Sequence, residues 1–241
     1  MNIRSKGIRA LSMLIYSVGV LIGITFLGFA VWGDLEAFLF DSSIGADASL
    51  KSLSCPVVIS ASETGTVSAS FKNPTENPIR PLIRVHISKG LHTLMREFNE
   101  RLPIAAGQTE RLEWVVSSED AVYGYLILAR VHMFRQYPLP SRTGACGIFV
   151  VDMPYLSGSQ MVNISLASSL MFMLGGGGSW YAGSLPLKGR TRTQSQAIFW
   201  LAAVIIAGLI FILVGEWLVS GVLFVISLLL ILAFVSYALL P

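Results

Sequence analysis

Apolar and polar positions divide the chain into long uncharged blocks on either side of one charged region. The first block, residues 10–32, contains no charged side chain and is long enough to cross a hydrocarbon core of about 30 Å as a helix. Trp32 suits the membrane interface, and three basic residues precede the block: Arg4, Lys6 and Arg9. We predict a basic cytoplasmic N-terminus at 1–9 and an uncleaved transmembrane helix at 10–32, with a cleaved signal peptide as the alternative.

The last apolar block is about twice as long as one span requires, and its one charged residue is Glu216 near the middle. A helical hairpin explains this pattern best. We predict transmembrane helices at 197–214 and 217–241, joined by an outer turn at 215–216. A bent interfacial segment is the alternative.

The segment 156–185 is a weaker candidate, because serines, Asn163 and four consecutive glycines disfavour a helix. Charge resolves the ambiguity. The positive-inside rule places both the N-terminal cluster and the basic loop 186–196, with Lys188, Arg190 and Arg192, in the cytoplasm. An even number of crossings must then separate the two, so 156–185 becomes the second of four spans. Three spans with an outer 186–196 loop is the alternative.

Residues 33–155 have the pattern of an all-β domain. In Leu82–Ser88 the apolar residues Ile83, Val85 and Ile87 alternate with Arg84 and His86, as on a half-buried strand. Short strands separated by turn signals are typical of immunoglobulin-like and fibronectin-like sandwiches, which we expect here as a fold analogy. The candidate strands are Cys55–Ser60, Thr66–Asn73, Leu82–Ser88, Arg96–Pro103, Thr109–Val116, Gly124–Phe134 and Cys146–Asp152.

The predicted fold class is therefore a four-helix membrane protein with an extracytoplasmic all-β sandwich inserted between helices 1 and 2. Cys55 opens the first candidate strand and Cys146 the last, and such strands often run close together. Because the domain is predicted outside the cytoplasm, we expect a disulfide between them. A reactive Cys146 is the alternative, although no activating base stands near it in the sequence.

One tripeptide occurs on two candidate strands, as Arg84-Val85-His86 and Arg130-Val131-His132. If these strands pair, Arg84, His86, Arg130 and His132 lie on one face. Such a patch could bind an acidic partner, phosphate or carboxylate, and two imidazoles could bind copper or zinc. An ordinary solvated sheet face is the simpler interpretation, and we assign no metal ligand.

Two further segments stand out. Residues 135–142 form a proline-stiffened loop in which Arg135, Tyr137 and Arg142 could dock onto a partner; a plain hairpin connection is the alternative. Gly175, Gly176, Gly177 and Gly178 lack the features of a phosphate loop and are assigned to helix packing, with a helix end or kink as the other option. Asn163 is expected to hydrogen-bond to a neighbouring helix.

Composition agrees with a membrane protein: 54% of residues are apolar, 13% are charged, and the net charge is +3. The basic excess lies in the predicted cytoplasmic segments, so nucleic acid is not an expected partner. Catalytic motifs are missing, and we assign no catalytic residue and no cofactor.

We expect a non-enzymatic accessory or scaffolding subunit of a membrane complex, in a bacterial-type inner membrane, whose partners are other membrane subunits and the lipid bilayer. The alternatives are an extracytoplasmic ligand- or metal-binding module and a membrane enzyme with an unrecognised site. Any small-molecule ligand stays unknown.

Overall fold

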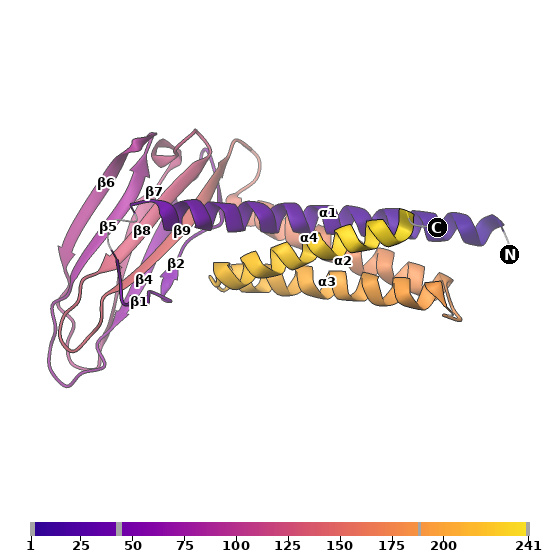
Figure 1. Ribbon diagram of the computed structural model, residues 1–241. Helices are drawn as coiled ribbons and strands as arrows, with labels where there is room; N and C mark the ends of the chain where they lie inside the picture. Colours follow the sequence, from indigo (N-terminus) through magenta and orange to yellow (C-terminus); the bar gives the residue numbers. More distant parts are fainter. Residues whose placement is uncertain (1–2, 42–44, 188, 240–241) are drawn as a thin grey trace. The chain divides into compact units, whose positions relative to one another are not determined.

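The computed structural model describes residues 3–41, 45–187 and 189–239 (Figure 1). Its helices are α1 (Ile3–Leu39), α2 (Gly158–Gly183), α3 (Arg190–Leu213) and α4 (Trp217–Leu239). Within the described residues, four helices are long and apolar enough to span a membrane, and the predicted membrane association is supported at that level.

The helix ends differ from those predicted by hydropathy. α1 continues through Asp34 to Leu39, and α3 begins at Arg190 rather than at residue 197. Hydropathy detects the part of a helix that lipid can surround, whereas polar residues extend the same helix beyond it. α2 keeps all four glycines inside the helix, so these glycines do not end it. Lys188, predicted in the basic loop, lies outside the described residues.

The connection between α3 and α4 is a tight helix-ending motif. Gly215 has φ 83°, its N–H donates to the carbonyl of Ile212, and the N–H of Glu216 donates to the carbonyl of Phe211. This is the Schellman pattern, in which a residue in the left-handed region follows the last helical residues. Glycine adopts that conformation without the steric cost of a Cβ, so Gly215 and Glu216 form the turn of a helical hairpin.

Between α1 and α2 the chain forms two sheets. The strands are β1 (Ala48–Ser49), β2 (Leu53–Ser54), β3 (Val58–Ser60), β4 (Gly65–Lys72), β5 (Leu82–Lys89), β6 (Leu91–Arg101), β7 (Thr109–Val116), β8 (Leu126–Met133) and β9 (Arg142–Val151), with the short helix η1 at Ser118–Asp120. The larger sheet has the order β1-β9-β8-β5-β6, with β3 also paired to β9, and the smaller sheet has the order β2-β4-β7.

This arrangement corrects the expectation of a closed, regular sandwich. β1 and β3 pair with β9 in parallel, so the larger sheet is mixed, while the other pairings of these sheets are antiparallel. β1 and β2 are two-residue strands that the sequence pattern did not predict. The β region is present, but its immunoglobulin-like or fibronectin-like closure is not seen as predicted.

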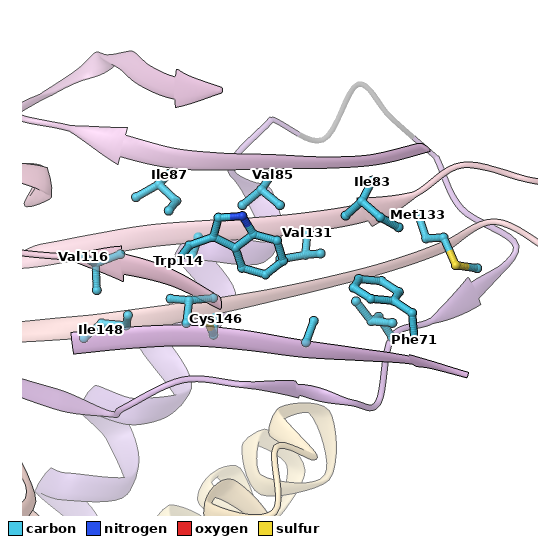
Figure 2. Close-up of a cluster of buried hydrophobic side chains, with 14 of the residues drawn as sticks. Phe71, Ile83, Val85, Ile87, Trp114, Val116, Val131, Met133, Cys146 and Ile148 are labelled. Carbon is cyan, nitrogen blue, oxygen red and sulfur yellow. The ribbon is translucent and has the colours of Figure 1, made fainter. Parts of the chain in front are cut away.

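Side chains from both sheets meet in one hydrophobic core (Figure 2). Phe71 and Trp114 come from the smaller sheet, and Ile83, Val131 and Ile148 come from the larger one. Burying one such side chain contributes about 1.5–3 kcal/mol. The alternation that predicted the inner face of β5 is therefore the alternation that builds this core.

The chain divides into two compact units. The first consists of residues 1–31 with residues 163–241, and the second consists of Trp32–Val162. The second unit contains both sheets, the last turns of α1 and the first turn of α2. Each unit is described separately below.

Candidate functional site

The repeated Arg-Val-His tripeptides lie on neighbouring strands in the middle of the larger sheet. β5 and β8 pair antiparallel, with Arg84 opposite His132 and His86 opposite Arg130. The four basic side chains are thus brought to one face of the sheet. They do not form an exposed patch, because His86, Arg130 and His132 are only 8%, 7% and 4% exposed.

The last turns of α1 and the residues after them supply contacts that bury this face. An Nη1 of Arg130 donates to the carbonyls of Phe38 and Phe40, at 2.9 Å each. Nδ1 of His86 lies 2.6 Å from a carboxylate oxygen of Asp41, which has φ 48° just beyond the helix end. A cation at helix-terminal carbonyls satisfies unpaired acceptors and opposes the negative end of the helix dipole. These side chains therefore fix the end of α1 to the sheet.

Two glycines allow this end of α1 to approach the sheet closely. A Cβ on Gly147 of β9 would meet the backbone of Gly33, whose Cα would lie only 2.7 Å away. The N–H of Gly147 donates to the Asp34 carboxylate at 3.1 Å, and Ala37 is completely buried against the same face. Sequence reasoning missed this contact, although Gly33 and Ala37 are small residues spaced four apart on one helix face.

Burial and neighbouring charges shift the pKa values of two side chains in the buried patch. Burial lowers the pKa of the His132 imidazole, and the positive charges of Arg130 and Arg84 lower it further. Burial also lowers the pKa of Arg130, against the opposing effect of Asp41. His132 is therefore neutral at neutral pH, because its ordinary pKa of about 6.5 is already below that value.

Metal binding at this patch lacks a suitable ligand set. His86 has a carboxylate on each side: Asp41 at Nδ1, and Glu97 at 3.8 Å from Nε2. Two ligands on opposite edges of one imidazole cannot bind a single ion. Within the described part of the chain, no group of three or more His, Cys, Asp or Glu residues could hold a metal.

Arg84 occupies the solvent-accessible edge of the patch. Its Nε donates to Asn99 at 3.0 Å, and its guanidinium carbon lies 5.0 Å from the centre of the Phe134 ring. It also lies 3.4 Å from Glu97. Arg84 thus contacts other side chains on the sheet surface. The patch as a whole attaches the end of α1 to the larger sheet.

The loop at 135–142 is a tight, ordered turn. Gln136 and Leu139 exchange two backbone hydrogen bonds, and the Gln136 side chain accepts the N–H of Arg80 at 3.1 Å. Leu139 is buried, whereas Tyr137 at the tip is 91% exposed. Among the predicted docking residues, Arg135 is exposed beside it and Arg142 is half-buried at the start of β9.

The Tyr137 turn lies at the end of the β8–β9 hairpin remote from α2. Leu126 pairs with Phe149 at one end of this hairpin, and the turn closes the other end. Phe149 also pairs with Val58, whose backbone lies directly against Gly158 at the start of α2. A strand of this length spans about 25 Å, so the turn is separated by about that distance from the first residues of α2.

The predicted disulfide is confirmed. Cys55 and Cys146 are bonded, with their Cα atoms 6.5 Å apart, and the bond ties the segment before β3 to β9. Both residues contribute to or pack against the shared core. The bond excludes the alternative of a free, reactive Cys146.

The predicted helix-packing residues behave unequally. A Cβ on Gly176 would meet the α1 backbone, with the Ser12 carbonyl oxygen at 2.8 Å, and Gly177 faces the Tyr16 ring at ordinary distance. Gly175 and Gly178 have open space around them, and Asn163 is exposed.

Sequence reasoning missed other small residues at the helix contacts. Ser169 of α2 donates its hydroxyl to the Gly19 carbonyl of α1, at 2.9 Å. Ser220 of α4 donates to the Gly208 carbonyl of α3, at 3.1 Å. The signal that could have revealed them is the spacing of small residues within otherwise large apolar runs.

Two hydrogen bonds set the relative register of the first three helices. The Tyr16 hydroxyl donates to the Ile198 carbonyl of α3 at 2.8 Å, and Nε of Arg9 donates to the Gly183 carbonyl of α2 at 2.9 Å. Arg9 precedes Tyr16 by seven residues, and Arg192 precedes Ile198 by six. The start of α1, the end of α2 and the start of α3 therefore lie at one end of this bundle (Figure 1).

Comparison with known proteins yields only partial likenesses. No protein-family model and no curated protein match the chain. A cycloisomaltooligosaccharide glucanotransferase from Paenibacillus sp. is 14% identical with a TM-score of 0.35, covering 45% of this chain and 15% of that one. A β-glucosidase from Erythrobacter marinus is 15% identical with a TM-score of 0.30, covering 44% and 15%.

A CARDB domain from Pyrococcus furiosus, solved in complex with di-metal ions, is 10% identical with a TM-score of 0.29. The match covers 42% of this chain and 90% of that domain. The chain thus spans only about a seventh of the two glycosidase-type enzymes it resembles in part. These likenesses establish neither a shared activity nor a shared ligand.

Proposed function

We propose that this chain is a non-enzymatic accessory or scaffolding subunit of a larger membrane complex, with the β region docking onto a partner subunit. The observation that carries the proposal is the Tyr137 turn. An exposed tyrosine on a turn closed by backbone hydrogen bonds loses little entropy when it binds, and tyrosine is among the residues most enriched at binding hot spots.

The turn leaves Tyr137 accessible to a protein partner. Tyr137 is 91% exposed, and its turn closes the end of the β8–β9 hairpin opposite the start of α2. Arg135 beside it supplies an exposed cation suited to an acidic partner surface.

The buried patch supports a non-enzymatic role. His86 and Asp41, which could have served as acid–base groups, and the nearby Arg130 are engaged in fixing the end of α1 to the sheet. A catalytic group must be able to reach its substrate, and these side chains are enclosed. Their use in the fold argues against both the enzyme and the metal-module alternatives.

We further propose cytoplasmic N- and C-termini, an extracytoplasmic β region, and residence in a bacterial-type inner membrane. Arg9 of α1 and Arg192 of α3 lie at one end of the bundle, which supports a common cytoplasmic side. The disulfide supports an oxidising location for the β region. A reporter fused after Arg192 tests the topology: a periplasmic signal there would contradict it.

The docking proposal is tested by extracting the full chain from its native membrane in mild detergent. We expect a stoichiometric partner to co-purify with the unchanged chain and with Tyr155→Ala, an equally exposed tyrosine just before α2. Tyr137→Ala should lose the partner, since truncating such an anchor weakens binding by roughly 30-fold or more. A lone monomer in every case, or a partner retained by Tyr137→Ala, would reject the proposal.

A further inference from the structure

The bundle end formed by the start of α1, the end of α2 and the start of α3 includes the basic residues Arg9 and Arg192. Residues 1–33 and 153–215 contain no Asp or Glu, so these segments supply no acidic side chain to balance the two cations. Like charges gathered at one end repel one another unless anions bind there.

One of these cations is held in a defined position. Nε of Arg9 donates to the carbonyl of Gly183, at 2.9 Å, at the last residue of α2. A guanidinium carries five N–H donors, and this bond uses one of them. The two Nη groups remain as a planar fork, which is the geometry that binds two oxygens of a phosphate.

A second donor follows one position along the chain. Ser184 comes directly after Gly183 and is only 5% exposed, yet its hydroxyl has no hydrogen-bond partner within the described residues. A buried hydroxyl without a partner is costly, and native structures nearly always satisfy one. Ser184 therefore supplies an enclosed donor one residue beyond the carbonyl that the Arg9 guanidinium binds.

We propose that Arg9 and Ser184 bind the phosphate of an anionic phospholipid headgroup, with the exposed Arg192 of α3 adding attraction. This site is separate from the Tyr137 turn and does not depend on the docking proposal. Arg9 is the last charged residue before the uncharged stretch of α1, which is the level at which headgroups meet hydrocarbon.

Exposed apolar side chains adjoin the two donors in the sequence. Ile8 precedes Arg9, Leu185 follows Ser184, and Leu11 lies two residues beyond Arg9 on α1. A phosphate that carries acyl chains can use both kinds of surface, whereas a free phosphate can use only the polar one. The combination selects a lipid as the source of the phosphate.

The experiment is native mass spectrometry of the full chain in mild detergent, titrated with phosphatidylglycerol or phosphatidylcholine. We expect preferential binding of phosphatidylglycerol, weakened about tenfold or more in Ser184→Ala, because a hydrogen bond to a charged group is lost. Arg9→Lys, which keeps the charge but removes the fork, should weaken binding similarly. Ser179→Ala is the matched control, since that exposed serine of α2 bonds only to its own helix.

Equal binding of phosphatidylglycerol by the unchanged chain, Ser184→Ala and Arg9→Lys would overturn the site and leave only diffuse attraction. Competition by inorganic phosphate at the lipid's own concentration would overturn the assignment to lipid. Thermal melting of each variant accompanies the titration. Ser184→Ala should melt no lower than the unchanged chain, because its hydroxyl has no bond within the described residues to lose.

Discussion

The substitution Gly147→Ala should loosen the packing of the end of α1 against the larger sheet. The new Cβ would contact backbone atoms of Gly33, with its Cα at 2.7 Å, where ordinary contacts begin near about 3.4 Å. Both partners are backbone, so no side chain can rotate away. Helix and strand must separate by roughly 1 Å, or the helix end must detach.

The magnitude follows from opposing contributions. Alanine in a strand is intrinsically better than glycine by about 0.5–1 kcal/mol, so any net loss must come from the contact. Overpacking typically costs about 1–3 kcal/mol. Detachment would break the bonds from Arg130 to the carbonyls of Phe38 and Phe40, at about 1.5–3 kcal/mol each. We therefore expect the helix end to stay mostly docked but to open more often.

Hydrogen–deuterium exchange of the purified full chain measures this opening. A cost of about 1–3 kcal/mol corresponds to roughly 5- to 150-fold faster exchange in residues 34–40. Strand β4 belongs to the other sheet and should keep its protection. Gly178→Ala, whose new Cβ would lie in open space on α2, is the control for a glycine-to-alanine change and should not accelerate exchange in residues 34–40. Unchanged exchange in 34–40 for Gly147→Ala would refute the close packing of helix and sheet.

Three further outcomes are expected. Burial holds the pKa of His132 below its unfolded value of about 6.5, so protonation favours the unfolded chain. The melting temperature should therefore fall as the pH drops below about 6.5. His132→Gln should reduce this dependence of the melting temperature on pH. Replacing Cys55 and Cys146 by serine should lower the free energy of unfolding by about 4–5 kcal/mol, since the bond spans 91 residues. Denaturation curves that do not shift would contradict this. Glu63→Gln should accelerate exchange at the start of α2 about tenfold, because its carboxylate accepts the N–H of Gly158 at 2.8 Å; exchange equal to that of the unchanged chain would contradict this role.

Long runs of uncharged, apolar residues predicted the membrane helices, because a helix that crosses the bilayer must be apolar over the thickness of the hydrocarbon core. A segment such as 217–241 needs no knowledge of its neighbours to be identified. The segment 156–185 needed charge as a second criterion, and α2 tolerates its glycines because one of them, Gly176, lets α1 approach closely. Propensity alone, which disfavours glycine in helices, pointed the other way.

Strand pairing was less accessible to sequence reasoning. Alternation identified Ile83, Val85 and Ile87 as the inner residues of β5, and these side chains are buried in the core. It gave no signal for β1 or β2, which are two residues long and owe their pairing to β9 and β4. Parallel pairing with β9 depends on long-range chain geometry, which a local pattern does not encode.

The Arg/His patch shows why a face predicted correctly can still be misinterpreted. Period-two alternation predicts which side chains share a face, but not what covers that face. The cover comes from the last turns of α1: the sequence placed these residues in the β domain beyond a span ending at 32, but not as a continuation of the helix that packs on the sheet. Two acidic residues there, Asp34 and Asp41, complement the backbone and histidine donors of the sheet.

That complementarity has a functional consequence. Buried charges are tolerated only when they are paired. The buried ionisable side chains of the β region, His86 and Arg130, are already bound to residues at the end of α1. The docking proposal therefore rests on an exposed group, Tyr137, whose turn closes the end of the β8–β9 hairpin opposite the start of α2. The same reasoning distinguishes Arg9 and Ser184 in the helix bundle, where a guanidinium positioned by the Gly183 carbonyl is followed one residue later by an enclosed hydroxyl that the described residues leave without a partner.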